Sequence, residues 1–365
     1  MIVHVFPKEK FTKPYIDFIN EMYDLNQHSF IVYGNYVDET FDIETYPNVS
    51  CFNTKKEVLR SKEVKMLLKK ASAVILHAYT DLVTSLVILN PFVAKKAAVV
   101  FWGADIYAHR DVLDHKVSLR VRFLDFLKGV GLRKCVMFLT FARDDFRLAK
   151  EWFGINGKHL DILYPSTVDK DNVERIYNLK PQNACMKVVI GNSATKTNQH
   201  FDAFDLLKHF SNENIEIYVP LSYGDMNYRD EVIQEGIRIF GEKFHAITEF
   251  MTPEEYSEFL CKMDIAIFNN DRQQATGNIE LLAYFGAKMF LRSDTVMWTY
   301  YVEDEKRLFF DVDKILDMSF DEFTDYEETM KEDNHNYFSN VWDKNNLKSI
   351  WRNVFDYMEL KNGKK

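Results

Sequence analysis

Small polar residues fill a segment that follows a short apolar run in the second half of the chain. This segment extends from Gly191 to His200 and precedes a stretch with helical periodicity. Backbone N–H groups at the start of a helix, with hydroxyl and amide groups beside them, bind phosphate oxygens well. We therefore predict a phosphate-binding loop; an ordinary helix-capping loop is the alternative. The pattern is neither G-x-G-x-x-G nor a Walker loop. The candidate binding residues are Gly191, Asn192, Ser193 and Asn198.

A second polar segment, residues 269–280, combines a cation, amides, a glycine and a carboxylate. The planar guanidinium of Arg272 suits a diphosphate, and Gly277 would let the backbone approach a ligand. The carboxylate of Glu280, one turn inside the expected helix, is placed to accept hydrogen bonds from ribose hydroxyls. A surface ion pair for Arg272 and a favourable helix-terminus charge for Glu280 are the alternatives. The clustering of these groups with Gln273 and Gln274 on one loop favours ligand binding.

The first half of the chain has one comparable segment, residues 102–107, which follows an apolar run. Asp105 in this segment is a candidate general base for an acceptor hydroxyl, or alternatively a helix N-cap. His77 ends another apolar run and is a second catalytic candidate, with a structural role as the alternative. The sequence has no HExxH or CxxC spacing, so we predict no metal site and no cofactor.

Alternating strand and helix patterns position these segments. Apolar runs predict strands at 2–6, 29–33, 73–77, 97–102, 135–140, 160–163, 187–192, 215–220, 264–268 and 287–291. Helical periodicity covers 55–70, 116–128, 145–153, 200–210, 228–241 and 277–286. Thr252, Pro253 and Glu255 form the start signal of a further helix. This βα alternation is typical of α/β proteins with doubly wound parallel sheets.

A polar, proline-containing stretch interrupts the alternation and divides the chain. We predict a Rossmann-like domain at 1–165, a linker at 166–184, a second Rossmann-like domain at 185–335 and a helical tail at 336–365. Such sheets bind ligands at the carboxyl ends of their strands. Two of them in one chain predict an enzyme that binds its ligand in the cleft between the domains.

Composition excludes several other classes of protein. The 365 residues are 47% hydrophobic and 28% charged, as in globular proteins, and the net charge of −9 argues against nucleic-acid binding. The N-terminus does not resemble a signal peptide, and no apolar run is long enough to span a membrane. We therefore expect a cytoplasmic protein.

Residues 108–150 carry ten Lys/Arg against five Asp, a formal charge of +5 in an otherwise acidic chain. Within this segment, apolar residues alternate with basic ones along the expected helix 116–128. Such a helix predicts peripheral attachment to an anionic membrane surface. The alternative is a solvated face whose apolar residues contact the sheet. The basic residues of the predicted patch are Lys116, Arg120, Arg122, Lys128, Arg133 and Lys134.

Four blocks in sequence order carry a family resemblance: VFWGADIY (100–107), VVIGNSATKTNQH (188–200), YVPLSYG (218–224) and NDRQQATGNIELLAYFGAKMFLRSDTVMW (270–298). They resemble the TDP-N-acetylfucosamine:lipid II N-acetylfucosaminyltransferases, also called 4-alpha-L-fucosyltransferases or glycosyltransferase family 56. The chain departs from the enterobacterial pattern after RQQ, where Ala275-Thr276-Gly277 replaces G-I-G, and at Glu280.

The resemblance implies the GT-B architecture of two facing Rossmann-like domains. It also implies transfer of an amino-deoxy sugar from a TDP donor to a lipid-diphosphate-linked saccharide, at the inner face of the cell membrane and without a metal ion. The 191–200 and 271–280 loops, with Tyr223, would bind the donor. Trp102, Gly103 and Tyr107 would lie on the acceptor side. A sugar-nucleotide epimerase and a non-catalytic binding module remain the alternatives.

Overall fold

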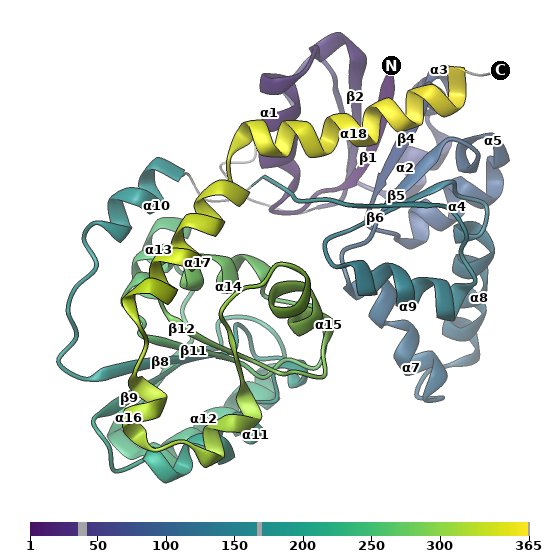
Figure 1. The fold of residues 1–365 in the computed structure, drawn as a ribbon. Helices are drawn as coiled ribbons and strands as arrows, with labels where there is room; N and C mark the ends of the chain where they lie inside the picture. The colour runs from purple at the N-terminus through teal and green to yellow at the C-terminus, as the bar shows by residue number, and fades with distance from the viewer. Residues whose placement is uncertain (36–41, 166–169, 364–365) are drawn as a thin grey trace. The chain divides into compact units, whose positions relative to one another are not determined.

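The computed structural model describes residues 1–35, 42–165 and 170–363. The chain divides into two compact units (Figure 1). One unit contains Met1–Thr167 and Asp343–Lys365, and the other contains Val168–Trp342. Each unit has its own parallel sheet, which we describe separately.

In the N-terminal unit, the described residues form a seven-stranded parallel sheet with the order β3-β2-β1-β4-β5-β6-β7. The strands are β1 (Ile2–Pro7), β2 (His28–Tyr33), β3 (Val49–Phe52), β4 (Ala73–His77), β5 (Ala97–Val100), β6 (Met137–Thr140) and β7 (Lys158–Asp161). The helices are α1 (Thr12–Met22), α2 (Lys55–Arg60), α3 (Lys62–Lys70), α4 (Asp81–Leu89), α5 (Pro91–Ala94), α6 (Ala104–Tyr107), α7 (His109–Leu113), α8 (Leu119–Leu132), α9 (Arg143–Phe153) and α18 (Lys344–Gly363).

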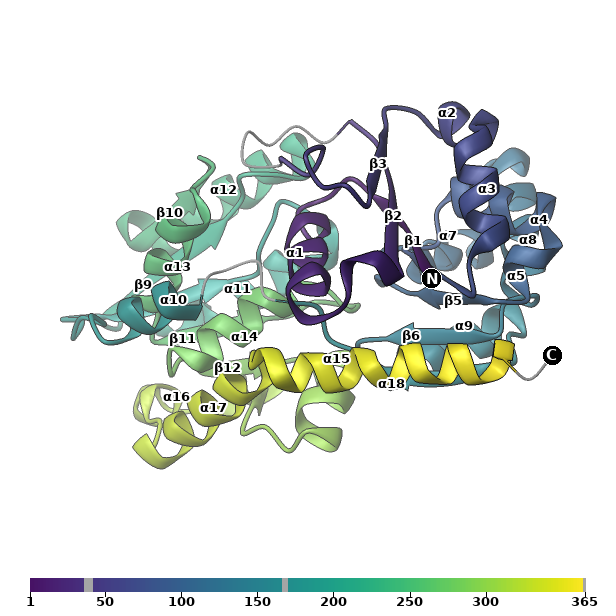
Figure 2. The same cartoon turned by 90° about the horizontal axis from the view of Figure 1, so that it is seen from above.

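Alternate residues of the central strands enter cores on opposite faces of this sheet. Val3 and Val5 of β1 belong to one core, and Ile2 and Phe6 belong to the other. The second core is covered by α18, the yellow helix of Figures 1 and 2, which contributes Trp351. Burial on both faces explains why β1, β4 and β5 are continuous apolar runs.

In the C-terminal unit, the described residues form a six-stranded parallel sheet with the order β10-β9-β8-β11-β12-β13. Its strands are β8 (Met186–Ile190), β9 (Ile215–Pro220), β10 (Phe244–Ile247), β11 (Ile265–Phe268), β12 (Lys288–Leu291) and β13 (Phe310–Asp311). The helices are α10 (Lys170–Tyr177), α11 (His200–Leu207), α12 (Met226–Phe240), α13 (Pro253–Cys261), α14 (Thr276–Tyr284), α15 (Val296–Trp298), α16 (Phe320–Thr324) and α17 (Glu328–Val341).

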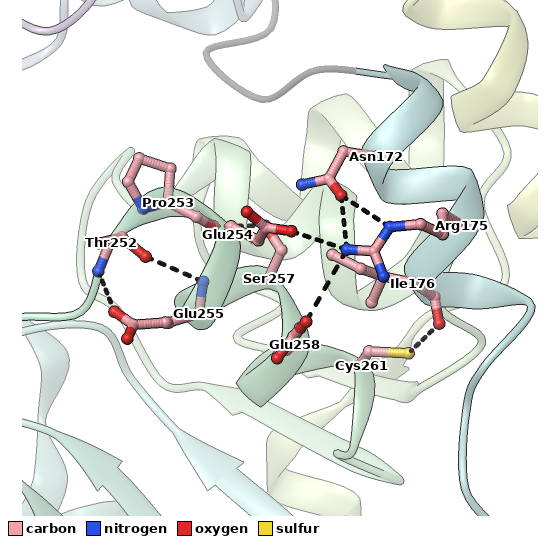
Figure 3. Close-up of polar contacts among 10 residues, drawn as sticks. All are labelled: Asn172, Arg175, Ile176, Thr252, Pro253, Glu254, Glu255, Ser257, Glu258 and Cys261. Carbon is pink, nitrogen blue, oxygen red and sulfur yellow. Dashed lines mark hydrogen bonds and ion pairs between the residues drawn. The ribbon is translucent and has the colours of Figure 1, made fainter. Parts of the chain in front are cut away.

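The stretch expected to be a linker contains helix α10 in its described part. Arg175 on α10 forms ion pairs with Glu254 at 2.7 Å and Glu258 at 3.9 Å on α13 (Figure 3). Ile176 is buried, and its carbonyl accepts a hydrogen bond from the Cys261 thiol. The capping box that starts α13 at Thr252 is present as predicted. Residues 170–177 are therefore an ordered part of the C-terminal unit.

The C-terminal tail also differs from the expected single helical segment. Helix α17 belongs to the C-terminal unit, whereas α18 packs within the N-terminal unit. The helix expected at 55–70 is divided into α2 and α3 at Ser61, which caps α3 by accepting the backbone N–H of Val64. The edge strands β3 and β10 were not predicted, because their partly buried residues do not form continuous apolar runs.

Candidate functional site

Two loops of the C-terminal unit meet because β8 and β11 are neighbouring strands. Gln274 joins them: its amide nitrogen donates to the Asn192 side-chain oxygen at 3.2 Å, and its oxygen accepts the Thr197 hydroxyl at 2.6 Å. Asn192 in turn donates to the Tyr223 hydroxyl at 2.8 Å. The structure therefore brings together three residues that the sequence analysis placed in separate segments.

Asn198 shapes the first loop from within. Its fully buried amide nitrogen donates to the carbonyl and hydroxyl oxygens of Ser193 and Thr195. Its oxygen accepts the backbone N–H of Asn192 at 3.2 Å. Gly191 is required beside it, since φ is +65° and a Cβ there would lie 2.7 Å from the Asn198 oxygen. Asn198 therefore influences ligand binding by holding the shape of this loop.

Several buried polar atoms at this edge of the sheet have no hydrogen-bond partner among the described residues. Asn270 is 3% exposed, and neither its side-chain nitrogen nor its oxygen is paired. Nε2 of the fully buried His200 and the side-chain oxygen of Gln273 are also unpaired. Buried polar groups are normally satisfied, because leaving one unpaired costs about 1–3 kcal/mol. These atoms are therefore candidate contacts for a bound ligand.

Asn270 and His200 were not singled out from the sequence. His200 begins α11, and its other ring nitrogen lies 3.1 Å from the Tyr228 hydroxyl. Burial lowers the pKa of His200 to about 4, so the ring is neutral at physiological pH. Only their positions in the sequence marked these residues: Asn270 lies just after a strand, and His200 lies at the start of a helix.

Arg272 and Gly277 lie on the second loop, as expected. Arg272 is partly buried and donates to the carbonyl of Gln273 at 3.1 Å. Gly277 is exposed, and a Cβ built there would meet no atom within 4 Å. Ala275 precedes α14 with φ +59°, a left-handed conformation that non-glycine residues adopt rarely. Open space beside Gly277 is compatible with close approach of a ligand.

Glu280 is placed differently from the expectation of a carboxylate open to ribose. One oxygen accepts the Trp342 indole N–H at 3.0 Å, and the other lies 3.5 Å from the Tyr301 hydroxyl. Burial raises the pKa of Glu280 to about 7. In this structure the carboxyl group therefore joins α14 to the end of α17.

In the N-terminal unit, Asp105 connects two loops at the carboxyl ends of β4 and β5. Its carboxylate accepts the backbone N–H of Trp102 at 3.0 Å and that of Tyr79 at 2.8 Å. Burial raises the pKa of Asp105, although these bonds and nearby Lys128 act in the opposite direction. Gly103 starts the short helix α6 with φ +83°, which brings Asp105 back toward Trp102.

Asp145 is a residue that the sequence analysis missed. It is 1% exposed and accepts the Tyr107 hydroxyl at 2.7 Å. Burial, together with the charge of Asp105, raises its pKa to about 7. The first turn of α9 thus binds the hydroxyl of the expected acceptor-side residue Tyr107. Sequence spacing gave no signal, because Asp145 reads as an ordinary acidic residue at a helix start.

His77 does not point toward an open cleft, which corrects the expectation. Its side chain is fully buried and stacks on Phe6 with ring centroids 4.0 Å apart. One ring nitrogen contacts the Tyr164 hydroxyl, and the other lies 3.2 Å from His4. His77 cannot touch a substrate in this conformation, because neighbouring aromatic rings enclose it.

The first two turns of α8 expose apolar residues to solvent. Leu119 is 80% exposed, Phe123 60% and Phe126 62%, and Val121 and Leu124 are also exposed. Arg120 and Arg122 lie exposed among them, and Lys116, Arg133 and Lys134 are exposed nearby. The alternative in which these apolar residues contact the sheet is therefore wrong for this half of the helix.

Lys128 does not belong to the exposed patch. Its ammonium donates to the backbone carbonyl of Asp105 and lies 5.0 Å from the Phe153 ring centre. Burial lowers the pKa of Lys128. The last turns of α8 are buried at Gly129, Gly131 and Leu132, so only the first half of the helix is available to a partner.

Within the described residues, no group of three or more His, Cys, Asp or Glu side chains is arranged to hold a metal ion. The helices in the described part of the chain are all too short or too polar to cross a bilayer.

Comparison with known proteins adds family information to this geometry. The sequence profile of the family described as 4-alpha-L-fucosyltransferase, glycosyl transferase group 56, matches residues 11–355. Among solved structures, a glycosyltransferase from Rickettsia africae is similar with a TM-score of 0.66, 10% identity and 98% of each chain covered. Trehalose 6-phosphate synthase from Burkholderia multivorans is similar with a TM-score of 0.65 and 9% identity, and the alignment covers 98% of each chain.

WaaG, a glycosyltransferase of lipopolysaccharide biosynthesis, is also similar, with a TM-score of 0.62 and 10% identity. The alignment covers 98% of this chain and 99% of WaaG. At these identities the likeness concerns the fold. The fold is GT-B, as the family resemblance implied.

Proposed function

Because the chain belongs to the 4-alpha-L-fucosyltransferase family, glycosyltransferase group 56, we propose that it uses a TDP-sugar donor and a lipid-diphosphate-linked saccharide acceptor. The transferred sugar is an amino-deoxy hexose similar to N-acetylfucosamine, and the product enters surface-polysaccharide synthesis. The observation that carries the donor half of this proposal is the set of unpaired buried atoms on Asn270, His200 and Gln273 beside the joined loops of the C-terminal unit.

The donor diphosphate lies on these loops in our proposal. Ser193 and Thr195 offer hydroxyl groups, Asn270 offers an amide, and Arg272 offers a cation. The N-terminus of α14 adds backbone N–H groups directed at the same place. Such preorganised donors stabilise the charge that develops on a leaving diphosphate. We therefore propose that transfer does not depend on a divalent metal ion.

Tyr223 and Phe250 give the donor half an exposed aromatic surface. Tyr223 is 44% exposed and Phe250 77%, and their rings are nearly parallel with centroids 6.3 Å apart. The Tyr223 hydroxyl also contacts Asn192 of the first loop. An exposed ring beside a phosphate-binding loop supports stacking of a nucleobase in the same site.

The acceptor contacts the partly exposed Trp102 in our proposal, and the buried Gly103 and Tyr107 shape this side of the site. Asp105 is the general base if the reaction inverts configuration, since each carboxylate oxygen retains a lone pair beyond the one used by a backbone N–H. If configuration is retained, Asp105 orients the acceptor instead. Its raised pKa brings it closer to the value at which a general base works best.

The exposed half of α8 holds the protein at the membrane that contains the lipid-linked acceptor, as a cytoplasmic protein attached to the inner face. Its phenylalanine and leucine side chains would enter the interface, and Arg120 and Arg122 would contact anionic headgroups. Each basic residue near such a surface contributes about 1 kcal/mol.

Incubation with TDP-sugars, with and without bacterial lipid extract, tests the proposed reaction. We expect a glycosylated lipid and free TDP only when lipid is present. Isomerisation of the TDP-sugar without lipid would instead identify an epimerase, and binding of TDP without any product would indicate a non-catalytic module. TDP affinity, measured by calorimetry, separates failure of the donor site from failure of the acceptor assignment.

A further inference from the structure

Three buried histidines form a continuous hydrogen-bonded chain across the N-terminal sheet. His28 begins β2, His4 lies within β1 and His77 ends β4, and these strands are neighbours. Nε2 of His4 lies 3.0 Å from Nδ1 of His28, and Nδ1 of His4 lies 3.2 Å from Nε2 of His77. The three side chains are at most 3% exposed. The chain therefore runs from the amino end of one strand to the carboxyl end of another.

At the carboxyl end, the chain continues to Tyr164 and Trp102. Nδ1 of His77 contacts the Tyr164 hydroxyl. The Trp102 indole N–H donates to the same hydroxyl at 3.2 Å. Trp102 is also held at its backbone N–H by Asp105, so the residue is fixed at two points.

The direction of every bond follows from the indole. An indole N–H can only donate, so the Tyr164 oxygen accepts from Trp102. Among the described residues, Nδ1 of His77 is the other polar contact of this buried hydroxyl, so the hydroxyl gives its own proton to that nitrogen. His77 then carries its proton on Nε2 and donates to Nδ1 of His4. By the same rule, His4 donates from Nε2 to Nδ1 of His28. The Tyr15 hydroxyl lies 3.5 Å from Nδ1 of His4 and does not set the direction, because the single lone pair of that nitrogen accepts the N–H of His77.

The hydrogen-bonded histidine chain requires all three imidazole rings to be neutral. A second proton on His4 or His28 would place two N–H groups opposite each other, and a second proton on His77 would face the O–H group of Tyr164. Burial lowers the pKa of His4 and His77 well below the usual range and that of His28 to about 4. Each ring is therefore held in one tautomer and one orientation by its neighbours.

We infer that His28, His4, His77 and Tyr164 are positioning residues, which hold the Trp102 indole in the orientation that receives the acceptor. This inference rests on the proposed acceptor role of Trp102. Phe6 and Phe11 flank the indole, with ring centroids 5.6 and 5.9 Å away, so packing restricts the ring and the Tyr164 hydroxyl sets the remaining orientation. The hydrogen-bonded histidine chain lies within the N-terminal unit, where we propose that the acceptor binds. It should therefore affect acceptor binding and leave TDP binding unchanged.

The tautomers can be measured directly in the wild-type protein. Nitrogen NMR of protein labelled with ¹⁵N-histidine separates protonated from unprotonated ring nitrogens. Variants His4→Gln, His28→Gln and His77→Gln assign the signals. We expect the neutral Nε2–H form for all three residues at pH 7. An Nδ1–H form or a charged ring at any of the three positions would overturn the inference.

Steady-state kinetics test the positioning role. Tyr164→Phe keeps the ring but removes the hydroxyl between Trp102 and His77. The loss of such a hydrogen bond is expected to raise the acceptor KM about fivefold to tenfold, with TDP affinity unchanged. Tyr15→Phe is the matched control, because it removes a buried hydroxyl from the same cluster without touching Trp102, and it should leave the acceptor KM unchanged.

Trp102→Phe distinguishes the proposed acceptor role of Trp102 from the positioning role of Tyr164 and the three histidines. If it leaves the acceptor KM unchanged, the acceptor role of Trp102 fails and the positioning role falls with it. If Trp102→Phe raises the acceptor KM while Tyr164→Phe behaves like Tyr15→Phe, the acceptor role stands and the positioning inference is overturned. The tautomers are read in the wild-type protein, and the histidine variants serve only to assign its signals, so a loss of activity in a variant does not decide that result.

Discussion

At the end of β11, the buried amide of Asn270 has no hydrogen-bond partner among the described residues. The free protein bears the cost of this unpaired group, and a bound diphosphate would remove the cost. Binding and stability should therefore respond in opposite directions to its removal. Asn198, a buried amide nearby with several partners, provides the contrast.

We predict that Asn270→Leu raises the free energy of unfolding by about 1–3 kcal/mol, because the unpaired polar atoms are replaced by apolar atoms of similar volume. The same change should weaken TDP binding about tenfold or more, since hydrogen bonds to a charged phosphate are lost. Denaturant unfolding and calorimetry measure the two effects. Asn198→Leu should instead destabilise the protein. A destabilised Asn270→Leu with unchanged TDP affinity would show that Asn270 is structural.

Asp105 has a structural role and a proposed chemical one. Asp105→Asn should lower turnover by about 10²–10⁴-fold and leave TDP affinity near that of the wild type, if the carboxylate is the general base. The amide nitrogen would also face the backbone N–H of Trp102 or Tyr79, so we expect a loss of about 1–3 kcal/mol in stability. Turnover should be measured well below the unfolding temperature of the variant. Wild-type turnover there would restrict Asp105 to joining the two loops.

Glu280 gives a pH-dependent prediction. Its folded pKa of about 7 lies above the ordinary value of 4.5, so the folded state retains a proton that the unfolded state loses in this range. Its stabilising contribution is full below pH 4.5 and is lost as the pH rises through 7. The free energy of unfolding of the wild type relative to Glu280→Gln should therefore fall between pH 4.5 and 8. Urea unfolding of both proteins measures this difference, and parallel pH curves would contradict the prediction.

At the scale of elements, α8 combines two environments within one helix. Its last turns are buried, and Lys128 contacts the backbone of Asp105. Its first two turns expose leucine and phenylalanine side chains that a purely structural helix would bury. The apolar and basic residues are thus presented together on the same exposed half, which supports the proposed contact with a membrane surface.

We predict that the wild-type protein co-sediments with anionic vesicles at low salt and is released at high salt, because basic residues near such a surface are screened. Arg120→Glu with Arg122→Glu should abolish this binding. Lys65→Glu with Lys69→Glu on α3 makes the same change in net charge at exposed positions and should not affect binding. Equal loss in the two double variants would mean that net charge alone governs association.

At the scale of the whole molecule, the proposed donor and acceptor sites belong to different units, each built on its own parallel sheet. The C-terminal unit holds the unpaired groups and the joined loops of the proposed donor site, and the N-terminal unit holds Asp105 and the histidine chain. The proposed donor site depends on helix N-termini, amides and Arg272 for charge compensation.

From this arrangement we predict that glycosyl transfer persists after dialysis against EDTA. The diphosphate would be neutralised by groups that belong to the chain, so added Mg²⁺ should change the initial rate by less than about twofold. Initial rates with TDP-sugar and lipid acceptor, with and without EDTA, give the measurement. Loss of turnover in EDTA and its recovery with Mg²⁺ would require a metal in the donor site.

The sequence by itself determined the two-sheet α/β architecture, because strands buried on both faces must be continuous apolar runs. It also predicted which loops are candidates for ligand binding, since polar residues after such strands lie at one edge of a parallel sheet. The family resemblance rested on residues 100–107, 188–200, 218–224 and 270–298, and the profile match over residues 11–355 confirms the family.

Only the tertiary structure decided how individual side chains are used. The burial of His77, the internal pairing of Glu280 and the contact of Asp145 with Tyr107 depend on residues far away in the chain. Sequence spacing records neighbours along one element, whereas hydrogen-bond partners across a sheet are set by strand order and register. The exposed half of α8 was undecided for the same reason, because amphipathic spacing does not say which face the sheet will cover.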